Sequence, residues 1–173
     1  MRNRMQRILK HLWLGSVATR HAMTPDAVRK LAQAVATSEQ RHSGEIRIYV
    51  ETSLPMGYLW RKASTRQITR QRALTLFGKL GVWDTAHNNG VLIYLLLAER
   101  AIEVVADRGL SARVEPQVWQ AMVARMSTAF KAGRFEAGLS EALAQVSSLL
   151  LEHFPLAAGQ TNPNELPDAP ILR

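Results

Sequence analysis

The fold follows from residues 91–97, Val91-Leu92-Ile93-Tyr94-Leu95-Leu96-Leu97. Every position in this run is apolar or aromatic, so neither face of an extended strand would be polar. A strand of this kind lies in the interior of a sheet that helices cover on both sides. The Asn89-Gly90 pair just before the run is typical of a turn and marks where the strand begins. These residues predict the central strand of a small α/β domain.

Two further strands are predicted around it. Residues 102–107 alternate apolar and polar side chains shortly after the central run, which predicts an antiparallel hairpin partner. Residues 45–51 alternate as well, which predicts a strand with one wetter face near a sheet edge. Between residues 45–51 and the central strand lies a basic helix that begins near Tyr58 or Ala63 and ends at Leu80. This order predicts a mixed sheet with a right-handed crossover between the first two strands.

The remaining helices have clear start and stop signals. Thr24 is followed by a proline and an acid, the pattern of a capped helix start. Pro116 begins another helix, Gly133 interrupts it, and a last helix continues to about His153. We therefore expect a three-layer α/β/α sandwich with a small mixed β-sheet, plus an N-terminal amphipathic helix.

The chain divides into three parts by composition. Residues 1–23 form an amphipathic N-terminal helix and linker, and residues 24–154 form the α/β domain. Four of the seven prolines lie within 155–173, which predicts an extended Pro-rich tail, either draped over the domain or disordered.

Charge and cysteine content narrow the function classes. The 173-residue chain has no cysteine, which excludes disulfide frameworks and thiolate chemistry. Its net charge is +8, and residues 1–72 hold 14 Lys and Arg against 4 Asp and Glu. This asymmetry indicates an anionic partner for the N-terminal half. Aromatic residues are sparse and no nucleic-acid motif accompanies the basic helix, so specific nucleic-acid binding is not predicted.

The first helix is amphipathic. Its apolar residues recur at helical spacing, and its basic residues cover the other side; the residues expected to contact a partner are Arg4, Arg7, Lys10 and Trp13. Two interpretations stay open: the helix docks on its own domain, or it contacts an anionic membrane surface or a partner protein. No clean signal-peptide core is present, so we expect a cytoplasmic protein, peripheral to the inner membrane if the helix binds lipid.

One constellation is suited to an ion. The loop that enters the central strand and the end of its hairpin partner lie at the same edge of the sheet. Asp84, Asn88 and Asp107 there offer oxygen ligands for Ca²⁺ or Mg²⁺, and Arg72 or Arg108 offers a contact for an anion. The alternative is structural: Asp84 and Asn88 shape a turn, and Asp107 pairs with Arg108. No organic cofactor motif is present.

Several sequence blocks resemble the TPM-domain family, in the family's order. They are Ser43-Gly44-Glu45-Ile46-Arg47, Arg72-Ala73-Leu74, Trp83-Asp84-Thr85, Asn88-Asn89-Gly90-Val91 and Asp107-Arg108-Gly109-Leu110. The likeness covers about residues 24–155 and is greatest to small soluble bacterial members. It implies the α/β/α fold, calcium binding through acidic loop residues in several members, and acid phosphatase activity in some plant members.

The enzyme machinery is sparse on this chain. It holds four aspartates, no Asp-x-Asp pair and no histidine pair at helical ligand spacing. We therefore expect a TPM-like binding or accessory module that binds a calcium-like ion and a partner protein or membrane surface. The alternative is a weak metal-assisted acid phosphatase, that is, a phosphomonoesterase. Whether the protein is an enzyme stays open at this point.

Overall fold

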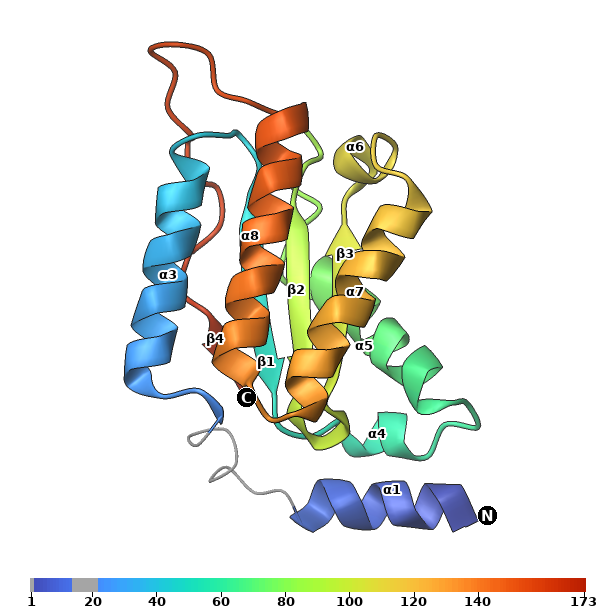
Figure 1. Ribbon diagram of the computed structural model, residues 1–173. Helices are drawn as coiled ribbons and strands as arrows, with labels where there is room; N and C mark the ends of the chain where they lie inside the picture. The colour runs from blue at the N-terminus through green and yellow to red at the C-terminus, as the bar shows by residue number, and fades with distance from the viewer. Residues whose placement is uncertain (1, 14–21) are drawn as a thin grey trace.

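The computed structural model describes residues 2–13 and 22–173, with side chains for 5–11 and 22–173. A four-stranded sheet with the order β3-β2-β1-β4 lies at its centre (Figure 1). The strands are β1 (Ile46–Glu51), β2 (Val91–Leu96), β3 (Ala101–Ala106) and β4 (Ile171–Leu172).

The strand pairing is mixed, as the sequence predicted. β1 and β2 run parallel, with Ile46 opposite Val91 and Glu51 opposite Leu96. β2 and β3 form an antiparallel hairpin closed by the short 3-10 helix η1 (Leu97–Glu99). The apolar run at 91–97 is thus confirmed as the strand at the centre of the domain.

Helices cover both faces of the sheet (Figure 1). On one face lie α3 (Pro25–Glu39), α7 (Pro116–Lys131) and α8 (Phe135–His153), which share a core with Ile93 and Leu95 of β2. On the other face lies α5 (Thr65–Lys79), packed on Leu92 and Tyr94. Alternate side chains of one strand therefore enter two separate cores. The α/β/α prediction is confirmed.

Local capping sets where the helices begin. The Thr24 hydroxyl accepts the Ala27 N–H at 3.1 Å, as expected for the predicted N-cap. Of the two predicted starts of the basic helix, the later one, near Ala63, agrees with α5, and the residues near Tyr58 form the separate short helix α4 (Met56–Leu59). The division lies at Ser64, which forms a reciprocal capping box with Gln67 and starts α5 at the next residue.

The prediction of a wetter face for β1 was wrong, whereas its predicted place near a sheet edge is confirmed. All six of its residues are buried, and β1 lies between β2 and β4. The C-terminal tail supplies the missing cover. Arg173 N–H donates to the Val50 carbonyl at 2.9 Å, and the Thr52 N–H donates to the Arg173 carbonyl at 2.7 Å. The Arg47 guanidinium donates to the carbonyls of Pro167 and Ala169. The tail is therefore draped over the domain.

The helix α1 (Arg2–Trp13) lies across the end of the sheet where β1 and β2 finish, beside α4 (Figure 1). None of the helices in the described ranges combines the length and the apolar composition that crossing a bilayer requires.

Candidate functional site

The two loops predicted to hold an ion do meet. Asn88, in the loop before β2, accepts the Gly109 N–H on its backbone carbonyl at 2.8 Å. Asp107 follows β3 and caps the short helix α6 (Arg108–Ser111), with Oδ1 accepting the Arg108 N–H at 2.7 Å. The Arg108 Nε donates to Asn88 Oδ1 at 3.0 Å. The structure thus joins Asn88, Asp107 and Arg108 at one end of the sheet, where β2 begins and β3 finishes.

The close approach of the two loops requires a glycine at position 109. A Cβ built there would lie 2.5 Å from the Asn88 carbonyl oxygen and 2.6 Å from that of His87. Those distances are shorter than real Cβ contacts, so the two loops approach closely only without a side chain. Asn88 itself has a positive φ of 52°, a conformation that asparagine tolerates better than most residues. The loop geometry is therefore fixed by the residues Asn88 and Gly109.

The carboxylates of the predicted ion site are in different surroundings. Oδ2 of Asp107 is buried and has no hydrogen-bond partner among the described residues. Asp84 is exposed, and within the same ranges it forms no hydrogen bond or ion pair with Asn88 or Asp107. In the described part of the chain, no three His, Asp or Glu side chains converge where a metal ion would be held. Of the three predicted ligands, the structure brings together Asn88 and Asp107 and leaves Asp84 exposed.

Arg72 lies at the opposite end of the sheet. From α5 it reaches Glu51, the last residue of β1, with Nε to Oε2 at 3.0 Å and Nη2 to Oε1 at 2.6 Å. The Tyr94 hydroxyl donates to Glu51 Oε2 at 2.7 Å. Although burial opposes the charged form, these contacts with Glu51 raise the pKa of Arg72. Of the two arginines predicted as alternative anion contacts at the ion site, Arg108 lies at the loop of Asn88 and Arg72 lies away from it, on Glu51.

Helix α1 contacts the domain through the polar side chains of Arg7 and His11 and through Ile8, which is half-buried against the core under α5. The Arg7 guanidinium donates to the carbonyls of Leu59, Arg61 and Ala63 at 2.6, 3.0 and 3.2 Å. His11 Nδ1 accepts the Leu54 N–H at 3.0 Å, and its Nε2 lies 3.0 Å from Glu99. Burial favours the neutral form of Glu99, but hydrogen bonds from His11 and Lys10 hold its pKa below the ordinary value. Arg7 is thus a structural residue of the interface between α1 and the domain.

Four large apolar side chains at this end are exposed, whereas Leu54 and Leu59 are buried. Met5 is 67% exposed and Leu9 61% exposed on α1, and on α4 and just after it the values are 50% for Met56 and 60% for Trp60. We call these four residues the apolar end. Exposed basic residues adjoin it: Lys10, Arg61 and Lys62. Arg4 and Trp13 belong to α1, but their side chains lie outside the described residues. Among the described side chains of α1, Met5 and Leu9 thus face solvent, whereas Ile8 is half-buried and Arg7 and His11 are buried against the domain.

A buried polar cluster behind the tail was not found from the sequence. Burial raises the pKa of Glu39 to about 8, although its Oε1 accepts the Ile46 N–H at 2.9 Å. Glu45 Oε2 accepts the Leu166 N–H of the tail at 3.0 Å. Burial lowers the pKa of His42 to about 4, and its ring lies 2.7 Å from the Ser38 hydroxyl. The sequence pattern does not show that these residues are buried, because contacts with the distant tail, such as Leu166 with Glu45 and Asn162 with the His42 carbonyl, cover part of the cluster.

Comparison with known proteins supplies the remaining observations. The profile of the TPM domain matches residues 17–149. The BA42 protein from the psychrophilic bacterium Bizionia argentinensis superposes with a TM-score of 0.72 at 24% identity, covering 87% of this chain and 95% of that one. The N-terminal domain of a protein from P. gingivalis superposes with a TM-score of 0.60 at 21% identity, covering 78% and 82%. None of the curated proteins matches the chain. Both structural likenesses show the fold alone.

Proposed function

The chain belongs to the TPM domain family, and we propose that it is a binding module that docks on an anionic membrane surface through the apolar end. One observation carries the proposal: Met5 and Leu9 of α1 are exposed, whereas Arg7 and His11 of the same helix are buried against the domain. The polar contacts of Arg7 and His11, together with the half-buried Ile8, hold the helix in place and leave Met5 and Leu9 exposed to solvent.

The chemistry of this surface fits a membrane interface. Removing apolar surface from water lowers the free energy by about 25 cal/mol for each Å². The four exposed side chains of the apolar end therefore favour transfer to an apolar environment. Tryptophan is favoured at the level of lipid headgroups, where Trp60 would lie. The adjoining Lys10, Arg61 and Lys62 supply the positive charge that anionic headgroups attract. Helices of this kind lie in the plane of the interface.

Removing the apolar side chains of α1 should release the protein from vesicles. With Met5→Gln and Leu9→Gln combined, we expect the partition coefficient onto phosphatidylcholine vesicles containing phosphatidylglycerol to fall roughly tenfold or more. Glutamine keeps the helix propensity while removing the apolar contact. Sedimentation of the full chain with the vesicles, at low and at high salt, measures the change.

The matched control is Leu74→Gln on α5, because Leu74 is an exposed leucine outside the apolar end. This variant should sediment like the parent protein. Equal sedimentation of parent and Met5/Leu9 variant, or no sedimentation with either, would reject the membrane and leave the apolar end to a partner protein.

A calcium-like ion at the loops of Asn88 and Asp107 is the second candidate. It is favoured by Asp107 Oδ2, a carboxylate oxygen that is buried without a partner among the described residues. Arg108 holds Asn88 Oδ1 in the structure, so an ion that takes this oxygen must displace a guanidinium. The metal-assisted phosphomonoesterase implied by the resemblance has no support beyond the family.

Opposite effects are expected from two neighbouring substitutions. Arg108→Gln should strengthen Ca²⁺ binding because it removes the competing cation, and Asp107→Asn should weaken it because it removes the carboxylate. Asparagine is also a good N-cap, so α6 should survive the second change. NMR titration with millimolar CaCl₂ measures both. Amide shifts at 84–89 and 107–109 that do not respond in the parent protein would refute the site.

A further inference from the structure

The outer edge of β3 is open. Pairing of β3 with β2 uses the backbone groups of residues 101, 103 and 105, so those of Ile102, Val104 and Ala106 point away from the sheet. Within the described residues one bond reaches this edge: Arg70 Nη1 donates to the Val104 carbonyl at 2.8 Å. The other sheet edge differs, because β4 of the tail pairs with β1.

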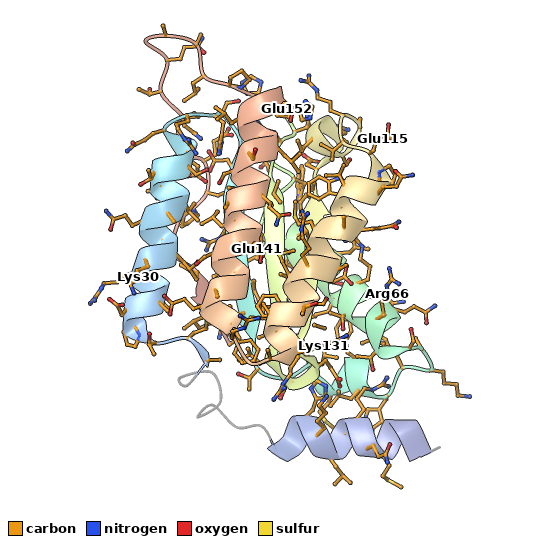
Figure 2. All side chains as sticks on the ribbon, in the orientation of Figure 1. Lys30, Arg66, Glu115, Lys131, Glu141 and Glu152 are labelled. Atoms are coloured by element: carbon orange, nitrogen blue, oxygen red, sulfur yellow. The ribbon has the colours of Figure 1, made fainter. Side chains whose placement is uncertain are left out.

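A groove of about 1170 Å³ runs along this edge. One wall is α5, which contributes Arg66 and Arg70, and the other is α7, which contributes Trp119 and Val123. Figure 2 shows Arg66 on α5 and Lys131 on α7, and both residues line the groove. A free strand edge between two helices has the dimensions and hydrogen-bonding groups that an added strand requires.

The charge of the groove selects an anionic ligand. Its basic residues are Arg66, Arg70, Arg100 and Lys131, and its acidic residues are Glu99 and Glu103. Both acids are already engaged, Glu99 by Lys10 of α1 and Glu103 by Arg70 at 3.4 Å. Burial raises the pKa of Glu103, against the opposing effect of the nearby Arg70 and Arg66. The remaining field is positive.

We propose that this groove binds an extended peptide of alternating acidic and apolar residues, which pairs with β3 as an added strand. Successive side chains of a strand point to opposite faces. On β3 itself, Ile102 and Val104 face the core under α7, and Val105 faces the core under α5. The peptide's alternate side chains thus meet Trp119 and Val123 on one side and the arginines of α5 on the other.

Arg70 has a defined part in this binding. In the free protein it occupies the Val104 carbonyl and so covers an acceptor that an unwanted strand would use. A peptide N–H takes over that carbonyl, and the released guanidinium pairs with a carboxylate of the peptide. A peptide without acidic residues would displace Arg70 from this carbonyl and supply no carboxylate in exchange, leaving Arg70 with Glu103 alone. The edge is thereby selective for acidic strands.

The test is an NMR titration of the full chain with a blocked heptapeptide of alternating Glu and Val. We expect saturable shifts confined to β3, α5 and α7, with Trp119 among them. N-methylation on alternate residues distinguishes strand addition from charge attraction. Methyl groups on the amides that face β3 should abolish binding, and methyl groups on the intervening amides should not.

Protein variants test the charge. Arg66→Glu should weaken binding roughly tenfold, because it turns an attraction into a repulsion. Arg125→Glu is the control, since it makes the same charge change on α7 outside the groove. Fluorescence anisotropy with the labelled heptapeptide measures both affinities.

Four outcomes overturn the proposal. They are no saturation at millimolar peptide, equal binding of both N-methylated forms, equal binding of a Lys-Val heptapeptide, and shifts that map to β1 and β4. Tight binding of single-stranded DNA in the groove without peptide binding would assign it to nucleic acid instead. None of these results bears on the apolar end, which lies at α1 and α4.

Discussion

Replacing Arg72 by methionine should lower the free energy of unfolding by about 3 kcal/mol. Arg72 binds both oxygens of Glu51 through Nε and Nη2, and both residues are buried. Methionine fills much of the space but carries no charge, so the Glu51 carboxylate stays buried with the Tyr94 hydroxyl as its remaining described partner. An unpaired buried charge is among the most destabilising defects in a protein. Urea denaturation at neutral pH measures the loss.

Two further variants show whether the ion pair is the cause. Arg66→Met changes the same residue type on the same helix at an exposed position and should shift stability by about 0.5 kcal/mol at most. Combining Glu51→Gln with Arg72→Met removes both charges and should recover most of the loss. Equal stability of the Arg72 and Arg66 variants would contradict the argument.

Replacing Gly90 by alanine should lower the free energy of unfolding by about 3 kcal/mol. A Cβ at this position would lie 1.9 Å from the Val82 carbonyl oxygen, an atom of the backbone that no side-chain rotation can move. Gly90 also accepts the Asp107 N–H on its carbonyl at 2.9 Å. A shift of residue 90 to relieve this contact therefore disturbs both the start of β2 and the loop of Asn88. Thermal unfolding followed by circular dichroism measures the effect.

Gly78→Ala provides the comparison for this substitution. Gly78 lies in α5, and a Cβ added to it would have open space around it to a distance of 4 Å. Alanine there should raise stability by about 0.5 kcal/mol, because it restricts the unfolded chain and favours helix. Effects of the same sign and size at the two glycines would show that the contact with Val82 is relieved by a small loop shift.

The sequence predicted those parts of the fold that local patterns decide. The run at 91–97 is apolar on both faces because two helical layers cover β2, and the Thr24 cap uses atoms three residues apart. The burial of β1 could not be predicted, because its outer edge is covered by β4, which is two residues long. A pattern of two residues is too short to distinguish a strand from an extended tail.

In the candidate site too, the contacts set by local sequence were predictable and those between distant elements were not. Hairpin geometry alone places Asn88 near Asp107, and the structure joins them through Arg108 and Gly109. The ion pair of Arg72 with Glu51 was not predictable. In the sequence Arg72 is one of several arginines on the same helix, and Glu51 lies on β1. The orientation of α1 was not predictable from its amphipathicity. Its docking surface presents the carbonyls of Leu59, Arg61 and Ala63, which require a donor rather than an apolar side chain.

The covering of β1 by the tail also has a kinetic consequence. The β2–β3 hairpin closes through η1, whereas the hydrogen bond from the Thr52 hydroxyl to the Arg173 carbonyl spans 121 residues. Loop closure slows as the separation of contacting residues grows. We therefore expect the hairpin to nucleate the sheet and the β1–β4 contact to form late. Until then β1 is an unpaired edge in a folding intermediate, and capture by another chain's strand is a hazard at that stage.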